Sequence, residues 1–254
     1  MVKYMLITSL ENERVKKYVK LKEKKYRDKY DEFIVEGMHL VLEACKTGNV
    51  IELILQQDEV LPFNLPIVYV TNEIINKISS LSNPAPVMAL CKKNNNEMLD
   101  AKKILVLDGI QDPGNLGTII RSSKAFDVDL IVLSEECVDL YNEKVIRSTQ
   151  GMIFHIPVIR RNIVEFLKEI KDSNIPIYGT KVEYGEDVRY LKEKDKASYV
   201  LVMGNEGSGL SLEVEKLCDS FLYIAMNDSV ESLNVAVATS ILLYEFRGSN
   251  YGND

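Results

Sequence analysis

The chain has no tryptophan and only two histidines and four cysteines among its 254 residues. The cysteines stand far apart, at Cys45, Cys91, Cys137 and Cys218, so no Cys-x-x-Cys pair is available for zinc binding or dithiol chemistry. Separated thiols are typical of a reducing compartment, and we expect a cytoplasmic protein. His39 and His155 cannot build a multi-histidine metal site. Both lie in apolar stretches, so we expect structural roles for them and no bound metal.

Long apolar runs are also missing. A helix needs about 20 consecutive apolar residues to cross a bilayer, and no stretch of this chain approaches that length. The apolar piece Met5–Ile7 is too short for a signal peptide, and Glu11 and Glu13 follow it at once. We therefore expect no membrane partner and no secretion signal.

Negative charge predominates over the whole chain but not at its N-terminus. The formal net charge is −7, whereas residues 1–30 contain ten Lys or Arg and four acidic residues. Charges separated by more than about 8 Å are largely screened at physiological salt, so this basic segment can attract phosphates on an acidic protein. The alternative is a solvated helix with one charged face, which charge alone does not exclude.

Apolar periodicity predicts a first α/β unit up to residue 93. We expect a helix over 11–30, a strand at Phe33–Val35, a helix at Met38–Cys45, strands at 51–55 and 67–70, a helix over 72–78 and a strand at 87–91. The polar run that follows, Lys92–Asn96, has nothing to bury. The sequence therefore predicts a first domain over 1–93, a linker over 94–100 and a second domain over 101–254.

Strands and helices alternate more clearly in the second domain. Strands are expected at 103–107, 130–133, 175–178, 199–203 and 222–224, with helices at 116–126, 141–149, 163–171, 211–217 and 235–246. This alternation predicts a parallel sheet with helices on both faces. The last helix, Val235–Phe246, is apolar on nearly every side, which favours a subunit interface in a homodimer.

The first of three polar loops at strand ends contains Asp112-Pro113-Gly114-Asn115 and is followed by Arg121. Ligands of parallel sheets bind beyond the carboxyl ends of the strands. Asn115 is a candidate N-cap, and Arg121 can reach back toward the start of its helix, where an anion would be favoured. A surface ion pair is the alternative role of Arg121.

The second and third loops follow later strands. The second, Gly204-Asn205-Glu206-Gly207-Ser208-Gly209-Leu210-Ser211, has neither the Gly-x-Gly-x-x-Gly order nor a Gly-Lys phosphate loop, and Glu206 would repel a pyrophosphate. The third runs from Ile224 through Ser232-Leu233-Asn234 into the last helix, for which Asn234 is a candidate N-cap. Each loop alone is a weak signal.

Together and in this order, the loops resemble the three signature motifs of the SpoU (TrmH) family of RNA ribose 2′-O-methyltransferases, in the SPOUT superfamily. The matching residues are Asn115-x-Gly117-x-x-x-Arg121, then 204–211, then Ser232-Leu233-Asn234-Val235-Ala236-Val237-Ala238. Arg147 to Gly151 and the N-terminal Phe33-Ile34-Val35-Glu36-Gly37 also resemble family segments. The third motif departs from the family's usual Ile-Pro-Met-x-Gly, since it reads Ile224-Ala225-Met226-Asn227-Asp228.

The resemblance implies a C-terminal SPOUT domain whose parallel sheet contains a deep trefoil knot, and a small N-terminal α/β ribosomal-protein-like domain that binds RNA. It implies S-adenosylmethionine as cofactor, bound mainly through backbone groups at Gly204, Ile224 and Leu233, with Met226 as a further wall of the cofactor pocket. It also implies a catalytic set of Arg121, Asn115, Glu206, Ser232 and Asn234. We expect Arg121 to act as an electrostatic clamp at the reacting ribose, and Lys24, Lys25 and Arg27 to contact RNA phosphates.

Three further functions remain as alternatives to a ribosomal RNA methyltransferase. The first is a transfer RNA methyltransferase, and the second is a catalytically silent RNA-binding factor of the same fold. The third is a nicotinamide-dependent oxidoreductase, which the α/β alternation allows, although this chain lacks a Gly-x-Gly-x-x-Gly loop after the first strand of the second domain.

Overall fold

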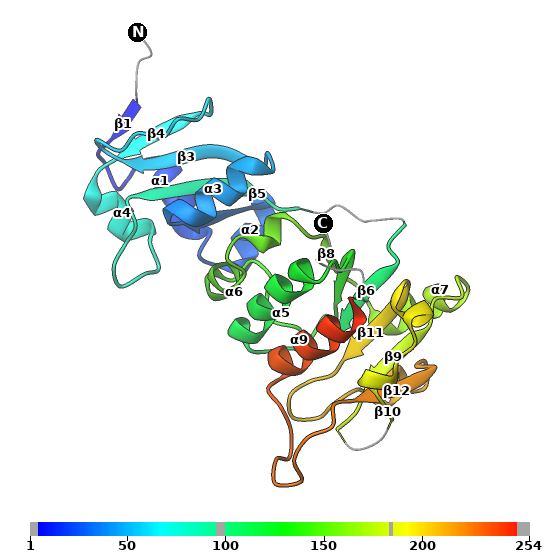
Figure 1. Ribbon diagram of the computed structural model, residues 1–254. Helices are drawn as coiled ribbons and strands as arrows, with labels where there is room; N and C mark the ends of the chain where they lie inside the picture. The colour runs from blue at the N-terminus through cyan, green and yellow to red at the C-terminus, as the bar shows by residue number, and fades with distance from the viewer. Residues whose placement is uncertain (1–4, 95–99, 183–184, 248–254) are drawn as a thin grey trace. The chain divides into compact units, whose positions relative to one another are not determined.

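The computed structural model describes residues 5–94, 100–182 and 185–247 (Figure 1). The chain forms two compact units. The first unit contains the residues up to Asn94 together with Asp139–His155. The second unit contains the residues between Asn94 and Asp139 and those from Ile156 onward. The expected linker over 94–100 falls mostly on residues 95–99, which lie outside the described residues.

A five-stranded mixed sheet forms the first unit. Its strand order is β1 (Met5–Ile7), β4 (Ile67–Val70), β3 (Val50–Gln56), β5 (Val87–Lys92) and β2 (Glu32–Glu36). The first three strands are parallel to one another, and β5 is antiparallel to both β3 and β2. Helices α1 (Glu13–Lys20) and α4 (Asn72–Ile78) share one apolar cluster with the sheet, whereas α3 (Met38–Lys46) packs against β5 and β2.

The single helix expected over 11–30 is two helices, α1 and α2 (Lys24–Tyr30), so that prediction was wrong. Leu21 is buried where the first helix ends. The Arg27 guanidinium donates to the carbonyl oxygens of Leu21 and Lys22, at 2.8 and 2.6 Å. These bonds satisfy carbonyls that the end of a helix leaves unpaired.

The segment Asp139–His155 contains α6 (Glu143–Ser148) and the 3₁₀ helix η1 (Met152–Phe154) and belongs to the first unit. The rings of Tyr141 and Phe154 lie 4.6 and 6.0 Å from that of Phe33, centroid to centroid. This apolar packing explains why a part of the chain expected in the second domain is found with the first.

The second unit is a seven-stranded sheet in which every pairing recorded between described strands is parallel. Its strand order is β10 (Glu186–Asp187), β12 (Ser220–Tyr223), β9 (Ile177–Thr180), β11 (Tyr199–Met203), β6 (Lys103–Leu107), β7 (Leu130–Leu133) and β8 (Val158–Arg160). Beyond β10 the chain forms the 3₁₀ helices η2 (Val188–Tyr190) and η3 (Glu193–Lys196). The alternation seen in the sequence therefore predicted the parallel sheet correctly.

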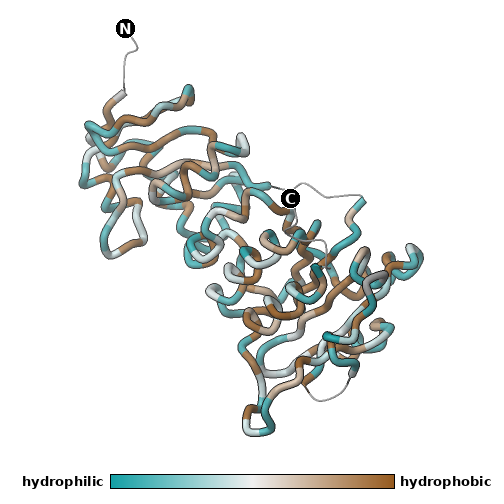
Figure 2. Tube along the Cα trace, in the orientation of Figure 1, coloured by the Kyte–Doolittle hydropathy of each residue, from teal (hydrophilic) through white to brown (hydrophobic). Residues whose placement is uncertain are grey.

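Helices cover both faces of this sheet. On one face α7 (Ile163–Lys171) and α8 (Leu212–Glu215) share an apolar cluster with alternate strand residues such as Val106 and Val202. Helices α5 (Pro113–Ala125) and α9 (Val235–Phe246) pack against each other, and Phe246 contacts the rings of Tyr178 and Tyr199 in the sheet. Figure 2 shows the central strands largely in brown, as burial on both faces requires.

Helix α5 begins earlier than the sequence predicted. Asp112, not Asn115, is its N-cap: the Asp112 carboxylate accepts the backbone N–H of Asn115 at 2.7 Å, and Pro113 occupies the first turn. Asn115 thus lies inside the helix, and its side chain is free for other contacts. No helix in the described ranges is long and apolar enough to span a membrane.

Candidate functional site

The order of the strands places the three polar loops at one edge of the second unit's sheet. Strands β6, β11 and β12 are parallel, and the loops follow their carboxyl ends. The backbone N–H of Ser211, in the second loop, donates to the Asp108 carboxylate of the first at 3.1 Å. The Asn205 amide donates to the Gly109 carbonyl at 2.7 Å. The first and second loops are therefore tied directly to each other.

One residue from each loop joins a continuous hydrogen-bond chain. The Asn234 Nδ2 donates to Asn115 Oδ1, and Asn115 Nδ2 donates to Glu206 Oε1, both at 2.9 Å. Asn234 Oδ1 also accepts the backbone N–H groups of Ala236 and Val237, so Asn234 is the N-cap of α9, as predicted. Three residues of the expected catalytic set thus lie side by side.

The second loop folds back on itself. Asn205 and Gly209 exchange backbone hydrogen bonds at 3.0 Å, and the Asn205 Oδ1 accepts the N–H of Gly207 at 2.9 Å. A Cβ atom at position 204 would overlap the backbone of Gly209 and Leu210. Glycine at 204 is therefore required by close backbone approach, at the point where the loop borders a pocket.

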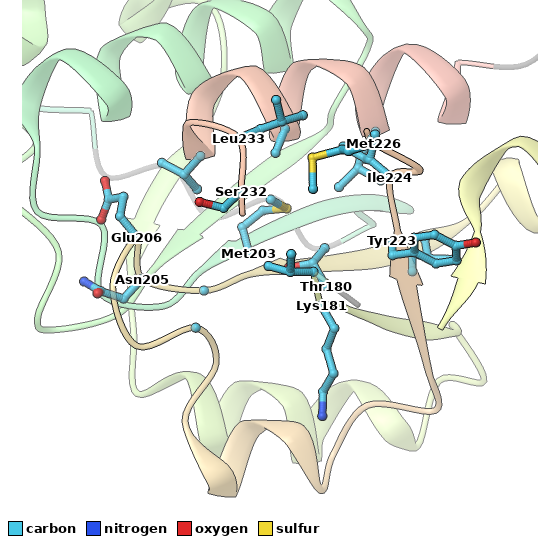
Figure 3. Close-up of a pocket in the computed structure, with 17 residues that line it drawn as sticks. Thr180, Lys181, Met203, Asn205, Glu206, Tyr223, Ile224, Met226, Ser232 and Leu233 are labelled. Atoms are coloured by element: carbon cyan, nitrogen blue, oxygen red, sulfur yellow. The ribbon is translucent and has the colours of Figure 1, made fainter. Parts of the chain in front are cut away.

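The pocket lies between this loop, the third loop and α9 (Figure 3). The four residues predicted to bind the cofactor all line it, as do two of the expected catalytic set: Gly204, Ile224, Met226, Leu233, Glu206 and Ser232. Figure 3 shows Glu206 and Asn205 at one end of the hollow and Tyr223 and Ile224 at the other. The second and third loops border this cavity, whereas the first loop contributes no lining residue and is joined to them by hydrogen bonds. The role of each residue stays a prediction.

The pocket has the character of a nucleoside site. It is a hollow, open in part to solvent, whose lining combines apolar side chains with a few polar groups, as is typical of small-molecule sites. Ile224, Met226 and Leu233 supply apolar walls for a purine ring, and the backbone at Gly204 is unobstructed by a side chain. These residues fit S-adenosylmethionine. Within the described ranges, no three His, Cys, Asp or Glu side chains are grouped as a metal site requires.

The sequence did not reveal a fourth wall of the pocket. Thr180 ends β9, and Lys181 and Val182 follow it; all three line the pocket because β9 lies next to β11 in the sheet. Lys181 forms an ion pair with Glu215 at 3.2 Å. A Gly-Thr at the end of a predicted strand was a weak signal, and the neighbour relation of β9 and β11 cannot be read from hydropathy.

Arg121 is set apart from the pocket. It is exposed on α5, does not line the cavity and has no ion-pair partner among the residues that the structure describes. The next residue, Ser122, shares a hydrogen bond of 2.7 Å with Ser240 of α9. The alternative role in a surface ion pair finds no partner, and the guanidinium is available to an anion from outside.

The expected RNA contacts in the first unit are divided. Lys24 and Lys25 are exposed, and their ammonium groups pair with Asp28 and Glu23 on the same surface. The Glu23 carboxylate raises the pKa of Lys25 through a hydrogen bond. For Arg27 the prediction was wrong. Its residue is 7% exposed and its guanidinium forms an ion pair with Asp139 at 2.6 Å, so burial removes it from any phosphate.

Both histidines have structural contacts. His155 Nε2 lies 2.7 Å from the Glu43 carboxylate, and His39 Nε2 lies 3.2 Å from the Gln150 carbonyl oxygen. All these contacts are inside the first unit. The interpretation of both side chains as structural is consistent with this placement.

Comparisons with known proteins agree on one family. The model described as the SpoU rRNA Methylase family matches residues 102–244, and the MRM3-like substrate binding domain matches residues 12–89. The chain is 36% identical over 247 residues to the 23S rRNA (guanosine(2553)-2′-O)-methyltransferase RlmP of Bacillus subtilis, covering 95% of this chain and 99% of the relative. The AdoMet-bound rRNA methyltransferase from Sinorhizobium meliloti has a TM-score of 0.85 at 29% identity, with 96% of this chain and 97% of that chain covered. Two family models that together cover most of the chain, and a relative aligned over 95% of it, show that this chain belongs to the SpoU rRNA methylase family.

Proposed function

We propose that this protein transfers a methyl group from S-adenosylmethionine to a ribose 2′-hydroxyl of 23S ribosomal RNA. The observation that carries the proposal is the hydrogen-bond chain from Asn234 through Asn115 to Glu206, which joins the three motif loops and ends at a residue that lines the pocket. The curated relative from Bacillus subtilis is named for this reaction, and the substrate assignment rests on that likeness.

The division of labour follows from where the side chains lie. S-adenosylmethionine, when bound, supplies a methyl group on a positively charged sulfur. Ile224, Met226 and Leu233 would hold the nucleoside portion, and Gly204 would present its backbone to it. Glu206 and Ser232 border the same cavity and would orient the ribose or the cofactor. A fixed site of this kind accelerates transfer by aligning the reacting atoms.

Arg121 would bind the phosphate beside the target ribose from outside the pocket. A guanidinium offers five donors and no acceptor, so it stabilises negative charge that develops on the 2′-oxygen and cannot take up a proton itself. Its exposure on α5 suits an RNA strand that approaches over the surface. Lys24 and Lys25, both exposed, would contact phosphates elsewhere on the RNA.

We also propose a homodimer formed through α9, in a cytoplasmic protein whose second unit carries the trefoil knot of its superfamily. The support for the dimer is a row of apolar side chains left at the surface: Val237 and Tyr244 are 48% and 46% exposed, and Ile241 between them is partly exposed. These positions are four and three residues apart, so they share one side of the helix.

The test is methyl transfer to defined RNAs. Purified protein with methyl-labelled S-adenosylmethionine should label 23S RNA, offered both as naked transcript and in large ribosomal subunits, and the label should resist alkaline cleavage because a 2′-O-methyl group blocks it. Mass mapping then finds the nucleotide, with guanosine 2553 as the first candidate. Labelling of transfer RNA alone would instead support the transfer RNA alternative.

The silent RNA-binding factor and the oxidoreductase are separated by calorimetry. Tight binding of S-adenosylmethionine would favour the methyltransferase, no binding of it would favour the silent factor, and binding of NADH would favour the oxidoreductase. Arg121, Asn115 and Glu206 all match the family motifs, and this match argues against the silent factor.

A further inference from the structure

Two tyrosines on α2 form a stacked pair surrounded by lysines. The rings of Tyr26 and Tyr30 are nearly parallel, with centroids 6.4 Å apart and an interplanar angle of 14°. They are four residues apart, so they lie on one side of the helix. Arg27, on the same helix, is buried. Both are partly exposed.

Four ammonium groups lie over these two rings. Lys25 and Lys20 are 4.8 and 5.6 Å from the centroid of Tyr26, and two more surround Tyr30: Lys17 at 5.3 Å and Lys29 at 5.5 Å. The lysines come from both α1 and α2, so the two helices build one surface. We call Tyr26, Tyr30 and these four lysines the tyrosine–lysine surface.

Three of the four lysines are held only weakly, whereas Lys17 forms an ion pair of 2.6 Å with the largely buried Glu32. Lys25 pairs with Glu23, and the two side chains are 67% and 58% exposed, while Lys20 and Lys29 are also exposed. Exposed ion pairs and exposed cation–π contacts contribute little to stability, so these side chains can exchange one partner for another. An incoming ring can therefore displace an ammonium group from a tyrosine face without disturbing the fold.

We propose that the tyrosine–lysine surface binds an unpaired stretch of the RNA substrate, with Tyr26 and Tyr30 stacking on its bases and the lysines moving onto its phosphates. This rests on the proposed function. Aromatic rings flanked by cations are the arrangement that single-stranded nucleic acid requires, because every base has a π-face and every linkage a negative charge. A duplex hides its bases and would use the lysines alone.

The two chemistries are separable by substitution in the full-length protein. Tyr26→Leu removes the π-face but keeps apolar volume, and should weaken binding of a short unpaired RNA by at least about fivefold, the lower end of one base–aromatic stack. The dependence of affinity on salt should not change, since no charge is removed. Tyr26→Phe should keep the affinity of the original protein. Tyr30→Leu is the second variant, read only with its thermal stability, because Tyr30 also packs against the core.

Lysine variants give the opposite signature. Lys25→Ala with Lys29→Ala should weaken binding and reduce the salt dependence, because fewer phosphate contacts release fewer ions.

The matched control for Tyr26→Leu is Tyr190→Leu, which alters a tyrosine that is 71% exposed and lies beside the Arg189 guanidinium in the second unit. That substitution should leave affinity for the unpaired RNA unchanged.

An abasic strand of the same length decides whether bases are contacted. Its affinity should be equal for the original protein and for Tyr26→Leu. Equal affinity of those two proteins for the normal unpaired strand would overturn the inference, as would an equal effect of Tyr26→Leu on normal and abasic strands. Absence of methyl transfer by the original protein would instead contradict the proposed function.

Discussion

Asn234 uses both ends of its side-chain amide. Its oxygen caps α9, and its nitrogen donates to Asn115, which in turn donates to Glu206. From the sequence the cap and a direct role in the site were separate alternatives, and the geometry makes them compatible. Because the amide is anchored by the helix backbone, the orientation of Asn115 is set by the start of α9.

Two substitutions separate these tasks. Asn234→Asp keeps an excellent N-cap but loses the donor to Asn115, so thermal stability should be retained while methyl transfer falls at least tenfold. Asn234→Ala loses both contacts and should also destabilise the protein by about 1 kcal/mol. Unfolding curves and initial rates measure the two effects. If Asn234→Asp transfers methyl groups at the original rate, the hydrogen bond to Asn115 has no catalytic importance.

Arg121 is predicted to act on RNA rather than on the cofactor. Because its side chain does not line the pocket, Arg121→Ala should abolish methyl transfer while the affinity for S-adenosylmethionine, measured by calorimetry, stays within a few-fold. Arg121→Lys keeps the charge but loses the fork of donors, and we expect intermediate activity. Near-normal turnover of the alanine variant would refute the clamp.

At the scale of elements, local patterns located most of the structure. Val235–Phe246, Ile163–Lys171 and Asn72–Ile78 have the bounds that the sequence predicted. The failures have tertiary causes. Beyond the end of α1 at Lys20, the Arg27 guanidinium supplies donors for the free carbonyls, and the guanidinium is itself held by Asp139 from far along the chain. Strands β8 and β10 are short edge strands of the sheet, which carry too few residues for a periodicity to emerge.

The Arg27–Asp139 pair tests this view of the break between α1 and α2. The two side chains are 8% and 18% exposed, so Asp139→Ala leaves a charge in a poorly solvated place and should destabilise the first unit by about 2–3 kcal/mol. Urea unfolding with hydrogen exchange of the α1 and α2 amides would measure this loss. The double variant Arg27→Met with Asp139→Leu removes both charges and should recover much of the lost stability. If Asp139→Ala causes no loss of stability, or if the double variant recovers none of it, the ion pair does not stabilise the first unit.

Glu43 makes the same unit sensitive to acid. Its carboxylate accepts from Lys46 at 2.6 Å and contacts His155 at 2.7 Å, and the Lys46 hydrogen bond, with that of His155, lowers the pKa of Glu43. A carboxyl whose pKa is lowered on folding stabilises the fold above its unfolded value of 4.5, and the contribution disappears as the pH falls through the lowered value.

Unfolding of the original protein and of Glu43→Gln should therefore differ at neutral pH and converge in acid. The difference in urea midpoint, followed from about pH 7 to about pH 3, measures the contribution of the carboxylate. A difference that is constant across this range would mean that the ionisation of Glu43 is irrelevant to stability.

At the scale of the whole molecule, the sequence predicted a site but not all of its walls. The order of strands along the sheet differs from their order in the chain, and for this reason the sequence did not predict that Thr180–Val182 line the pocket. The three motif loops were found because each carries an unusual local composition. The segment Asp139–His155 was assigned to the second domain because its contacts, such as Tyr141 with Phe33, connect residues more than a hundred positions apart.

The proposed dimer gives a prediction at this scale. Val237→Asp places a charge in the exposed apolar row of α9 without touching the buried face of the helix. We expect the mass in solution, measured by light scattering, to change from that of two chains to that of one. Glu245→Gln on the same helix is the control and should leave the mass unaltered. A single-chain mass for the original protein would end the proposal.

Because Asp139–His155 belongs to the first unit, the polypeptide passes from one unit to the other three times: after Asn94, after Val138 and after His155. One cleavage between residues 94 and 101 would leave the fragments joined through the packing of Tyr141 and Phe154 and the ion pair of Asp139. A gene truncated at that point would express a first unit without part of its own core. To isolate either unit, Asp139–His155 must therefore be separated from the second unit as well. A chain cleaved once between residues 94 and 101 should still elute from a sizing column as a single species.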